Sequence, residues 1–255
     1  MIFYTLTTLA ALPSKLFITM KDERKKTLER YTYNDYSSDL KKHWEECELE
    51  FAHLEAKKWR GGKEQVFKGH REKANLLLKK IKVGGSTLLD YGIGDGFLGY
   101  VLLKEYGLGK YVGVDIAERT LTTARKNLSN PDWDVELGLV PQDFAQHNPD
   151  IITSFACIQH FPSKEYLDQF LENVANASPS VIMFQIRNGE HGEQFSPDKP
   201  SLACLTTPSL LGKRLSDYKI NYTGKVLDNG YQTVVYSKKR KVWQKIKDFV
   251  FKEKS

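Results

Sequence analysis

The amino-acid sequence predicts a doubly wound α/β fold, with a mostly parallel sheet of seven strands, a closing antiparallel hairpin and a helical cap before the sheet. Three observations predict this fold. From Thr87 onward, short apolar runs alternate with amphipathic patterns of about ten residues. A glycine-rich loop follows the first apolar run, and the pair Asn229-Gly230 separates the last two. The alternation indicates right-handed βαβ units with parallel strands, and the Asn-Gly pair favours a hairpin.

Composition and pattern divide the 255 residues into three parts. Residues 1–38 are an N-terminal extension, 39–237 are the main domain, and 238–255 are a basic tail. Within the main domain, residues 39–82 are the helical cap and residues 86–237 are the core. Apolar residues in the cap recur at steps of three and four in two successive runs, which is typical of amphipathic helices.

The core is expected to contain seven strands and four helices. The predicted strands are Thr87–Tyr91, Tyr111–Val114, Asp134–Leu139, Ile151–Ala156, Val181–Ile186, 219–227 and 231–237. The predicted helices are Phe97–Tyr106, Arg119–Leu128, Lys164–Asn176 and Ser209–Leu215. The stretch Asn188–Thr207 has two prolines and little periodicity, so we expect a long loop that faces the substrate.

The positive charge of the chain is concentrated at its end. The net charge of +6 comes from 38 Lys/Arg and 32 Asp/Glu, and residues 238–255 hold eight of the basic and two of the acidic side chains. The remaining 30 basic and 30 acidic side chains cancel. The tail could lie on an anionic membrane surface, bind nucleic acid, or be a solvated helix.

The cysteines and the N-terminus indicate the compartment. Cys47, Cys157 and Cys204 lie far apart without a CxxC pair, which predicts a reduced, cytoplasmic protein without structural disulfides or a zinc cluster. The apolar N-terminus lacks the basic start of a signal peptide, and its apolar runs are too short to span a bilayer. Translation could begin at Met20, or residues 1–19 could pack on the main domain.

The loop Asp90–Gly99, "DYGIGDGFLG", has glycines at alternate positions between a predicted strand and a predicted helix. Glycine lets the backbone approach a ligand closely, and a helix N-terminus offers N–H groups. No Gly-Lys-Ser/Thr follows, so the loop is not a P-loop. Gly94, Gly96 and Gly99 fit the dinucleotide pattern G-x-G-x-x-G, but Asp90 would face the pyrophosphate, and about ninety residues precede the motif.

Acidic residues follow the next two strands. Asp115 ends the second strand, nineteen residues after Gly96, where a carboxylate can accept hydrogen bonds from both hydroxyls of a ribose. Asp143, in "VPQDF", could accept from the exocyclic amine of adenine. The fourth strand, in "DIITSFACIQHFP", leads directly into Gln159-His160.

The motifs "LLDYGIGDGFLG", "YVGVDIAERTLTTAR", "PQDF" and "DIITSFACIQHFP" resemble, in order and spacing, those of the class I S-adenosylmethionine-dependent methyltransferases, in the small-molecule branch. The resemblance spans residues 40–237, including the closing hairpin. It implies a Rossmann-like fold and S-adenosyl-L-methionine as the cofactor.

The resemblance also implies the cofactor contacts. Asp90 and the backbone of the loop would hold the methionine part, Asp115 would bind the ribose hydroxyls, and the last motif would place Phe155 beside the sulfonium and methyl group. The acid and the following amide in "PQDF" would bind the adenine edge. The residues implied are Asp90, Gly92, Ile93, Gly94, Gly96, Asp115, Ile116, Asp143, Phe144 and Phe155. The acids could instead cap helices or lie in solvated turns.

His160, just beyond the fourth strand, is the candidate general base, because the usual pKa of histidine suits proton transfer near neutral pH. The histidine could instead order its loop through hydrogen bonds. Arg187, Glu190 and His191 follow the fifth strand and are expected on the same substrate side. No metal is expected.

The sequence favours a small-molecule or sugar acceptor that is methylated at oxygen or nitrogen. The end of the fourth strand, Thr153–Ala156, lacks the Asn/Asp-Pro-Pro-Tyr tetrad of enzymes that methylate nucleic-acid bases. The aromatic segment 31–36 and Trp59-Arg60 could form a lid over the cofactor or pack in the core. The alternatives are a protein or RNA methyltransferase that docks through its tail, and a non-catalytic cofactor-binding subunit.

Overall fold

The computed structural model describes most of the predicted core and little of the cap. The described residues are 41–42, 44–45, 68, 71–77, 79, 82–140, 143–189, 192–195, 204–227 and 230–239. The predicted extension 1–38 lies outside them, as does the tail after residue 239. None of the helices in these ranges is long and apolar enough to cross a membrane.

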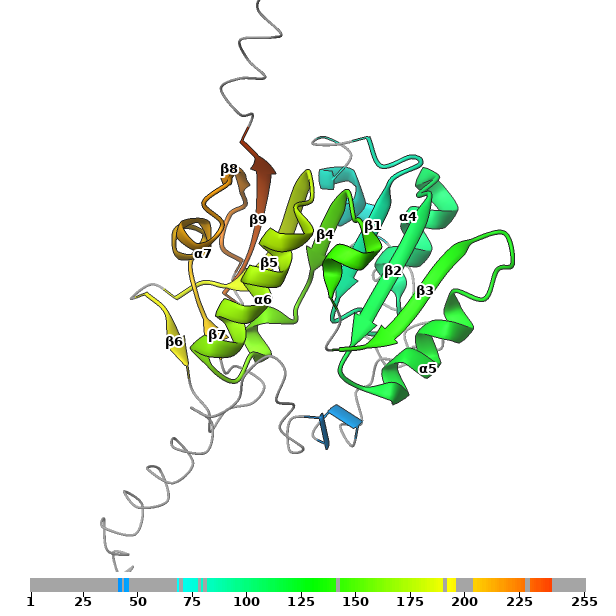
Figure 1. Cartoon of the computed structure of the whole chain (residues 1–255), viewed down its shortest axis with the longest axis horizontal. Coiled ribbons are helices and arrows are strands. Elements are labelled where there is room, and N and C mark those ends of the chain that lie inside the picture. The colour runs from blue at the N-terminus through cyan, green and yellow to red at the C-terminus, as the bar shows by residue number, and fades with distance from the viewer. Residues whose placement is uncertain are drawn as a thin grey trace, which may run out of the picture.

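The described core is a seven-stranded sheet flanked by helices (Figure 1). Its strands, in the spatial order β3-β2-β1-β4-β5-β9-β8, are parallel from β3 to β5, while β9 is antiparallel to both of its neighbours. The strands are β1 (Thr87–Tyr91), β2 (Lys110–Asp115), β3 (Asp134–Leu139), β4 (Ile151–Ser154), β5 (Val181–Arg187), β8 (Tyr218–Thr223) and β9 (Tyr231–Lys238). The predicted Rossmann-like sheet with its closing antiparallel hairpin is confirmed.

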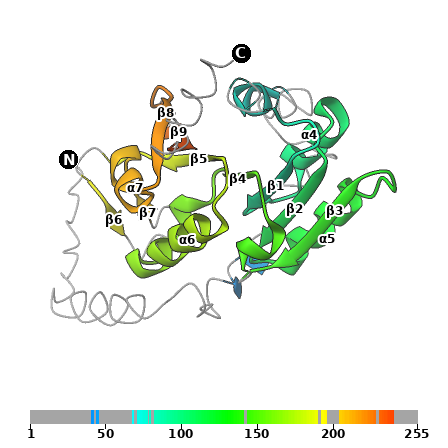
Figure 2. The same ribbon diagram turned by 45° about the horizontal axis from the view of Figure 1, so that its top comes forward.

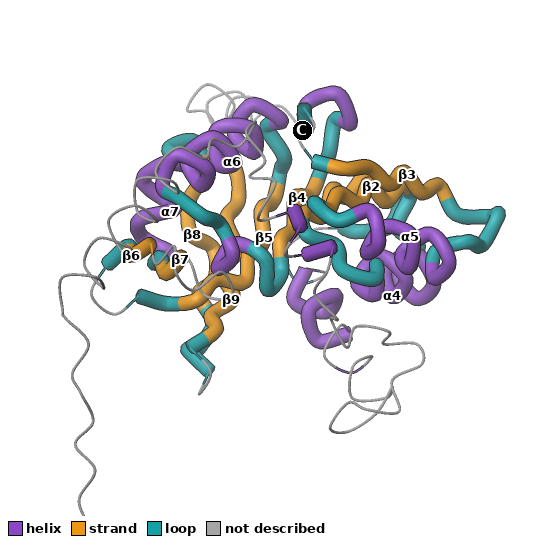
Figure 3. Tube along the Cα trace, turned by 90° about the horizontal axis from the view of Figure 1, so that it is seen from below, coloured by secondary structure: helices purple, strands orange, loops and turns teal. Residues whose placement is uncertain are grey.

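Helices cover both faces of this sheet. The helices and 3₁₀ turns are α4 (Phe97–Tyr106), α5 (Glu118–Asn127), η1 (Phe144–His147), η2 (Ile158–His160), α6 (Lys164–Ala177) and α7 (Pro208–Arg214). Residues 71–77 are also helical. Figure 3 shows α6 and α7 on one side of the strands and α4 and α5 on the other.

Local sequence signals set the helix ends. The hydroxyl of Ser163 accepts a hydrogen bond from the Tyr166 N–H at the start of α6, and Thr207 accepts one from Leu210 at the start of α7. These caps satisfy backbone donors that a helix start leaves without an intrahelical partner. Each such cap contributes about 1 kcal/mol.

Each face of the sheet has its own hydrophobic core. On β1, Leu88 packs with the cluster under α4, α5 and helix 71–77, whereas Leu89 and Tyr91 pack with the cluster under α6 and α7. This alternation follows from the two-residue period of a strand. Burying one such large side chain contributes about 1.5–3 kcal/mol. A buried hydrogen bond between the hydroxyls of Tyr91 and Tyr166, 2.8 Å long, crosses the second cluster.

Three details of the prediction were wrong. The strand predicted at 219–227 is β8, which ends at Thr223. The fourth strand ends at Ser154 rather than Ala156, because Ala156 adopts a left-handed conformation with φ of 50° that ends the ladder. The stretch after β5 is not wholly loop: β6 (Gln194–Phe195) and β7 (Cys204–Leu205) form an antiparallel pair. Two-residue strands are too short to give a periodic signal. Figure 2 shows this pair set apart from the main sheet, beside α7.

Candidate functional site

The predicted site residues follow the carboxyl ends of the parallel strands, the edge where open α/β sheets bind ligands. The loop after β1 is fixed there by its backbone: the Gly92 N–H donates to the Val114 carbonyl at 2.8 Å. Gly92, Gly94 and Gly96 have φ of 74°, 57° and 78°. A Cβ on Gly92 would lie 2.3 Å from Cys157 Sγ, whereas one on Gly94 would meet no atom of the described residues within 4 Å. The loop therefore packs on the protein at Gly92 and is open to a ligand at Gly94.

Ile93 and Gly96 support this loop from the protein side. The Ile93 side chain is buried in the core against Gly113, and a Cβ on Gly96 would lie 2.8 Å from Leu128 Cδ1. At both positions the backbone, rather than a side chain, is left for the predicted contact with the cofactor.

Asp115, at the end of β2, is linked to the glycine loop. Its carboxylate accepts hydrogen bonds from the Gly94 N–H at 3.2 Å and the Ala117 N–H at 3.1 Å. Burial raises the pKa of Asp115 to about 6, although these amide donors favour the charged form. Ile116 follows it, half-buried against the core. The arrangement holds a carboxylate at the loop, as a ribose-binding acid requires.

Asp90 is buried beneath the loop and held by two donors. The hydroxyl of Thr153 donates to one carboxylate oxygen at 2.7 Å, and the hydroxyl of Tyr111 donates to the other at 2.9 Å. Burial raises the pKa of Asp90 to about 6, and the two hydrogen bonds and Lys73 oppose that rise. Both oxygens are thus engaged by the protein, so Asp90 links β1 to its two neighbours, β2 and β4.

Lys73 is a site residue that the sequence analysis missed. Its Nζ lies 4.6 Å from the centroid of the Phe155 ring, just beyond β4. Burial lowers the pKa of Lys73 to about 8, although the charge of Asp90 favours the ammonium form. Its place on the buried stripe of its helix, four residues before Leu77, was the available signal, because a lysine at such a position needs a partner.

The end of β4 places Phe155 at the same edge. The left-handed Ala156 turns the chain sharply after Phe155 and brings Cys157 against Gly92. Non-glycine residues with positive φ are uncommon and cluster at functional sites. Burial raises the pKa of the Cys157 thiol far above its usual value, so this cysteine packs against the loop as a neutral group.

Asp143 and Phe144 start the turn η1. The Asp143 carboxylate accepts from the Ala145 N–H at 2.9 Å, and the Phe144 N–H donates to Asn173 Oδ1 at 3.2 Å. The Phe144 ring is fully buried in the aromatic cluster with Tyr91. The exposed Asp143 carboxylate keeps further acceptor capacity, whereas the Phe144 N–H would have to exchange its partner; both contacts with adenine stay predictions.

A polar group of side chains, which we call the acceptor cluster, lies beyond β4 and β5: Gln159, His160, Arg187 and Tyr231. The Gln159 amide nitrogen lies 3.0 Å from the Tyr231 hydroxyl and 3.0 Å from His160 Nε2. The Arg187 guanidinium carbon lies 5.5 Å from the centroid of the Tyr231 ring. The sequence analysis named His160 and Arg187 but not Gln159 or Tyr231 as partners.

Two residues of the N-terminal segment contact the site, one beside Asp115 and one beside His160. The Glu45 carboxylate accepts from the N–H groups of Glu118 and Arg119, at 2.8 and 3.2 Å, and so caps α5 just after Asp115. The Trp44 ring meets the His160 ring edge-on, with centroids 4.6 Å apart. The predicted helical cap thus contacts the site at these residues. The aromatic segments 31–36 and 59–60, and the predicted residues Glu190 and His191, lie outside the described residues.

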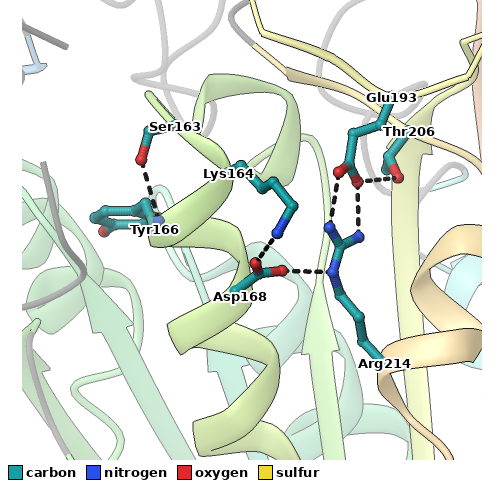
Figure 4. A network of polar contacts seen from close by, with 7 residues as sticks. All are labelled: Ser163, Lys164, Tyr166, Asp168, Glu193, Thr206 and Arg214. Atoms are coloured by element: carbon teal, nitrogen blue, oxygen red, sulfur yellow. Dashed lines mark hydrogen bonds and ion pairs between the residues drawn. The ribbon is translucent and has the colours of Figure 1, made fainter. Parts of the chain in front are cut away.

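An ion-pair network anchors the stretch after β5 (Figure 4). Arg214, at the end of α7, donates to both carboxylate oxygens of Glu193 at 2.8 and 2.7 Å and also pairs with Asp168 of α6. Thr206 donates to the same Glu193 carboxylate at 3.1 Å. The network ties the strand-pair region to both helices. Within the described ranges, no cluster of three His, Cys, Asp or Glu could hold a metal ion.

Part of the chain matches known proteins. The model of a family described as "Methyltransferase domain" matches residues 88–178. The chain is 39% identical to the ribosomal protein L11 methyltransferase of Burkholderia mallei over 70 residues. These residues make up 28% of this chain and 23% of that protein. The chain therefore spans less than a quarter of the length of the curated relatives that it matches.

Solved structures share the fold. The magnesium protoporphyrin IX methyltransferase of Synechocystis PCC 6803 with bound SAH superposes with a TM-score of 0.53 at 14% identity, over 88% of this chain and 97% of that one. An S-adenosylmethionine-dependent methyltransferase of Mesorhizobium loti gives 0.51 at 16% identity, over 68% of this chain and 100% of that one. At such identities the likeness concerns the fold alone.

Proposed function

We propose that this chain is a class I S-adenosylmethionine-dependent methyltransferase, and that it transfers a methyl group to oxygen or nitrogen of a small-molecule or sugar acceptor. The match of residues 88–178 to a methyltransferase domain supports the reaction type. The observation that carries the proposal is the pairing of two different surfaces at one sheet edge. One surface offers a glycine loop and the Asp115 carboxylate, and the next offers the acceptor cluster.

The residues of the first surface fit the cofactor. S-adenosylmethionine, when bound, supplies an electrophilic methyl group on a sulfonium. The Asp115 carboxylate can accept from ribose hydroxyls, and the open backbone at Gly94 leaves room for close approach. The Lys73 ammonium lies over the Phe155 ring, where it suits the carboxylate of a methionine moiety, and the charge of Asp90 favours that ammonium form.

The chain's own task in the reaction is alignment and proton removal. In-line displacement needs the acceptor atom held opposite the leaving group, and correct positioning can supply most of the rate enhancement. We assign proton removal to His160. A hydroxyl acceptor needs this step, whereas an amine acceptor does not. The edge contact with Trp44 and the hydrogen bond to Gln159 hold this ring within the acceptor cluster.

The test is calorimetric titration of the full chain with S-adenosylmethionine, its demethylated product and NAD. We expect binding of the first two and none of NAD, with loss of binding in Asp115→Ala. Asp132→Ala, at an exposed aspartate before β3, is the matched control and should bind normally. Binding of NAD alone would overturn the proposal. A screen of acceptors that measures product release from the cofactor then tests the small-molecule assignment, and exclusive activity on protein or RNA would replace it.

A further inference from the structure

The arginine of the acceptor cluster differs from three other described arginines. Arg71 pairs with Glu105, Arg125 with Glu118, and Arg214 with Glu193 and Asp168. Arg187 pairs with no carboxylate in the described part of the chain. Its guanidinium instead stacks over the Tyr231 ring, and its side chain lies against Gly230, where a Cβ would come within 3.2 Å of Nε.

Tyr231 holds Arg187 at the edge of the sheet. The two residues face each other directly across the antiparallel ladder of β5 and β9. They are the last residue of β5 and the first of β9, so both lie at the carboxyl edge of the parallel strands. A guanidinium stacked on a ring keeps its N–H donors in the plane of the guanidinium, where they can bind a carboxylate or phosphate with two hydrogen bonds.

Gln159 supplies a second, independent sign of a ligand. Gln159 is only 1% exposed, yet its side-chain amide oxygen has no hydrogen-bond partner among the described residues. The amide nitrogen has two neighbours, Tyr231 and His160. If the amide is turned over, the oxygen meets these neighbours and the nitrogen is left instead. In either orientation one buried polar end needs a partner, and buried polar groups normally have one.

From this arrangement we propose that Arg187, held by Tyr231, binds an anionic group of the methyl acceptor, a carboxylate or a phosphate, while Gln159 hydrogen-bonds a neighbouring polar group of the same molecule. The inference rests on the proposed methyl transfer and names its substrate class. The class is small molecules that carry a carboxylate or a phosphate, including acidic sugars and phosphorylated sugars. The anion would be fixed beside His160, so the acceptor atom next to it faces the base.

The experiment titrates the full chain, with and without the saturating demethylated cofactor product, with inorganic phosphate, glucuronate and glucose. We expect phosphate or glucuronate, but not glucose, to bind at millimolar concentrations. Arg187→Ala should weaken that binding by at least about tenfold, since a charge-assisted hydrogen bond is lost. Arg187→Lys should recover only part, because an ammonium cannot form the paired hydrogen bonds. Arg125→Ala, at an exposed arginine in the last turn of α5, should bind as the parent does.

The outcomes separate the two proposals. Equal anion binding by the parent and Arg187→Ala, or binding of none of the anions, overturns the anion site. Loss of anion binding in Arg187→Ala together with unchanged binding of the cofactor product supports it. Failure of the parent chain to bind S-adenosylmethionine or its product overturns the proposed function instead, and the anion titration without cofactor still decides the role of Arg187. The anion that binds more tightly identifies the anionic group of the acceptor as a phosphate or a carboxylate.

Discussion

The two halves of the site contrast in construction and in charge. The first half, Asp90, residues 92–96 and Asp115, is made of backbone amides and buried carboxylates. The second half, the acceptor cluster, is made of side chains that meet from β5, β9 and the turn after β4. The first half favours a cation and the second an anion, since charges of opposite sign attract strongly at partly buried sites. The edge thereby sorts two ligands by charge.

The largest effect is expected where the first half is most tightly packed. Gly92→Ala combines a strained φ of 74° with a Cβ placed 2.3 Å from Cys157 Sγ. We expect it to lower the free energy of unfolding by roughly 2–4 kcal/mol and to abolish binding of the cofactor product. Chemical denaturation and calorimetry measure the two effects, while anion binding by the second half should persist if the chain still folds.

Two further variants separate the causes. Gly107→Ala has a similar φ of 66° but open space around the new Cβ, so it should cost only about 1 kcal/mol. Cys157→Gly in the Gly92→Ala background removes the clash and should recover part of the loss. No recovery would mean that backbone strain alone causes the defect.

The next effect concerns charge in the first half. Asp115→Asn should weaken binding of the cofactor product by about ten- to a hundredfold, because an amide cannot accept from both hydroxyls with charged oxygens. In the parent, the raised pKa values of Asp115 and Asp90, both about 6, predict that affinity falls as the pH drops through about 6. The protonated acids accept hydrogen bonds less well, so the loss approaches about tenfold per pH unit for each proton taken up. Calorimetry from pH 5 to 8 measures the slope.

The variant also tests the assignment of that slope. Asp115→Asn removes one titrating group, so its affinity should depend less steeply on pH than that of the parent. An unchanged slope would assign the titration to Asp90 alone. Above pH 8 the lowered pKa of Lys73 predicts a second decline, as the ammonium loses its proton, and Lys73→Met should remove that limb.

A smaller effect should be confined to the acceptor side. Arg214→Ala removes the paired hydrogen bonds to Glu193 and loosens the stretch after β5, at a cost of about 1–2 kcal/mol. We expect a higher KM for the acceptor and an unchanged Kd for the cofactor. Lys164→Ala, which removes an exposed partner of Asp168, should change the KM for the acceptor and the Kd for the cofactor only slightly. Weakened cofactor binding in Arg214→Ala would contradict the separation of the halves.

The smallest effect is expected at Tyr111→Phe. This change removes one of the two donors to Asp90 and should cost about 1 kcal/mol of stability. It should also raise the pKa of Asp90 further, since the lost hydrogen bond favours the charged carboxylate. The pH at which cofactor affinity declines should therefore move upward, and an unmoved midpoint would show that Asp90 does not govern it.

The first half could be predicted from the sequence because it is local. Its glycines follow one strand and Asp115 ends the next. Because consecutive parallel strands place their carboxyl ends at the same edge, the order of the motifs brings them together without knowledge of tertiary contacts. The strands and helices of the core were predicted to within a few residues for the same reason. Ala156 was not predicted, because its left-handed conformation depends on the packing of Cys157 against Gly92.

The second half could be predicted only in part because it is assembled from distant segments. Gln159 and Tyr231 are 72 positions apart, and no periodic pattern links a turn after β4 to the start of β9. Glu45 meets the start of α5 across 73 positions, which a sequence pattern cannot show either. For Lys73, its place on a buried stripe signals that it needs a partner, but the sequence does not show that this partner is Phe155, 82 positions away.

The position of β9 has a consequence for how the chain matures. This last strand of the sheet lies between β5 and β8, and it carries Tyr231. During synthesis, β1 to β4 leave the ribosome well before residues 231–238, so the backbone edge of β5 stays unpaired until β9 forms. The nascent chain thus gains its cofactor-binding edge first and its means of choosing a substrate last. Ribosome-bound chains that stop before β9 should bind cofactor without yet being able to select what they methylate.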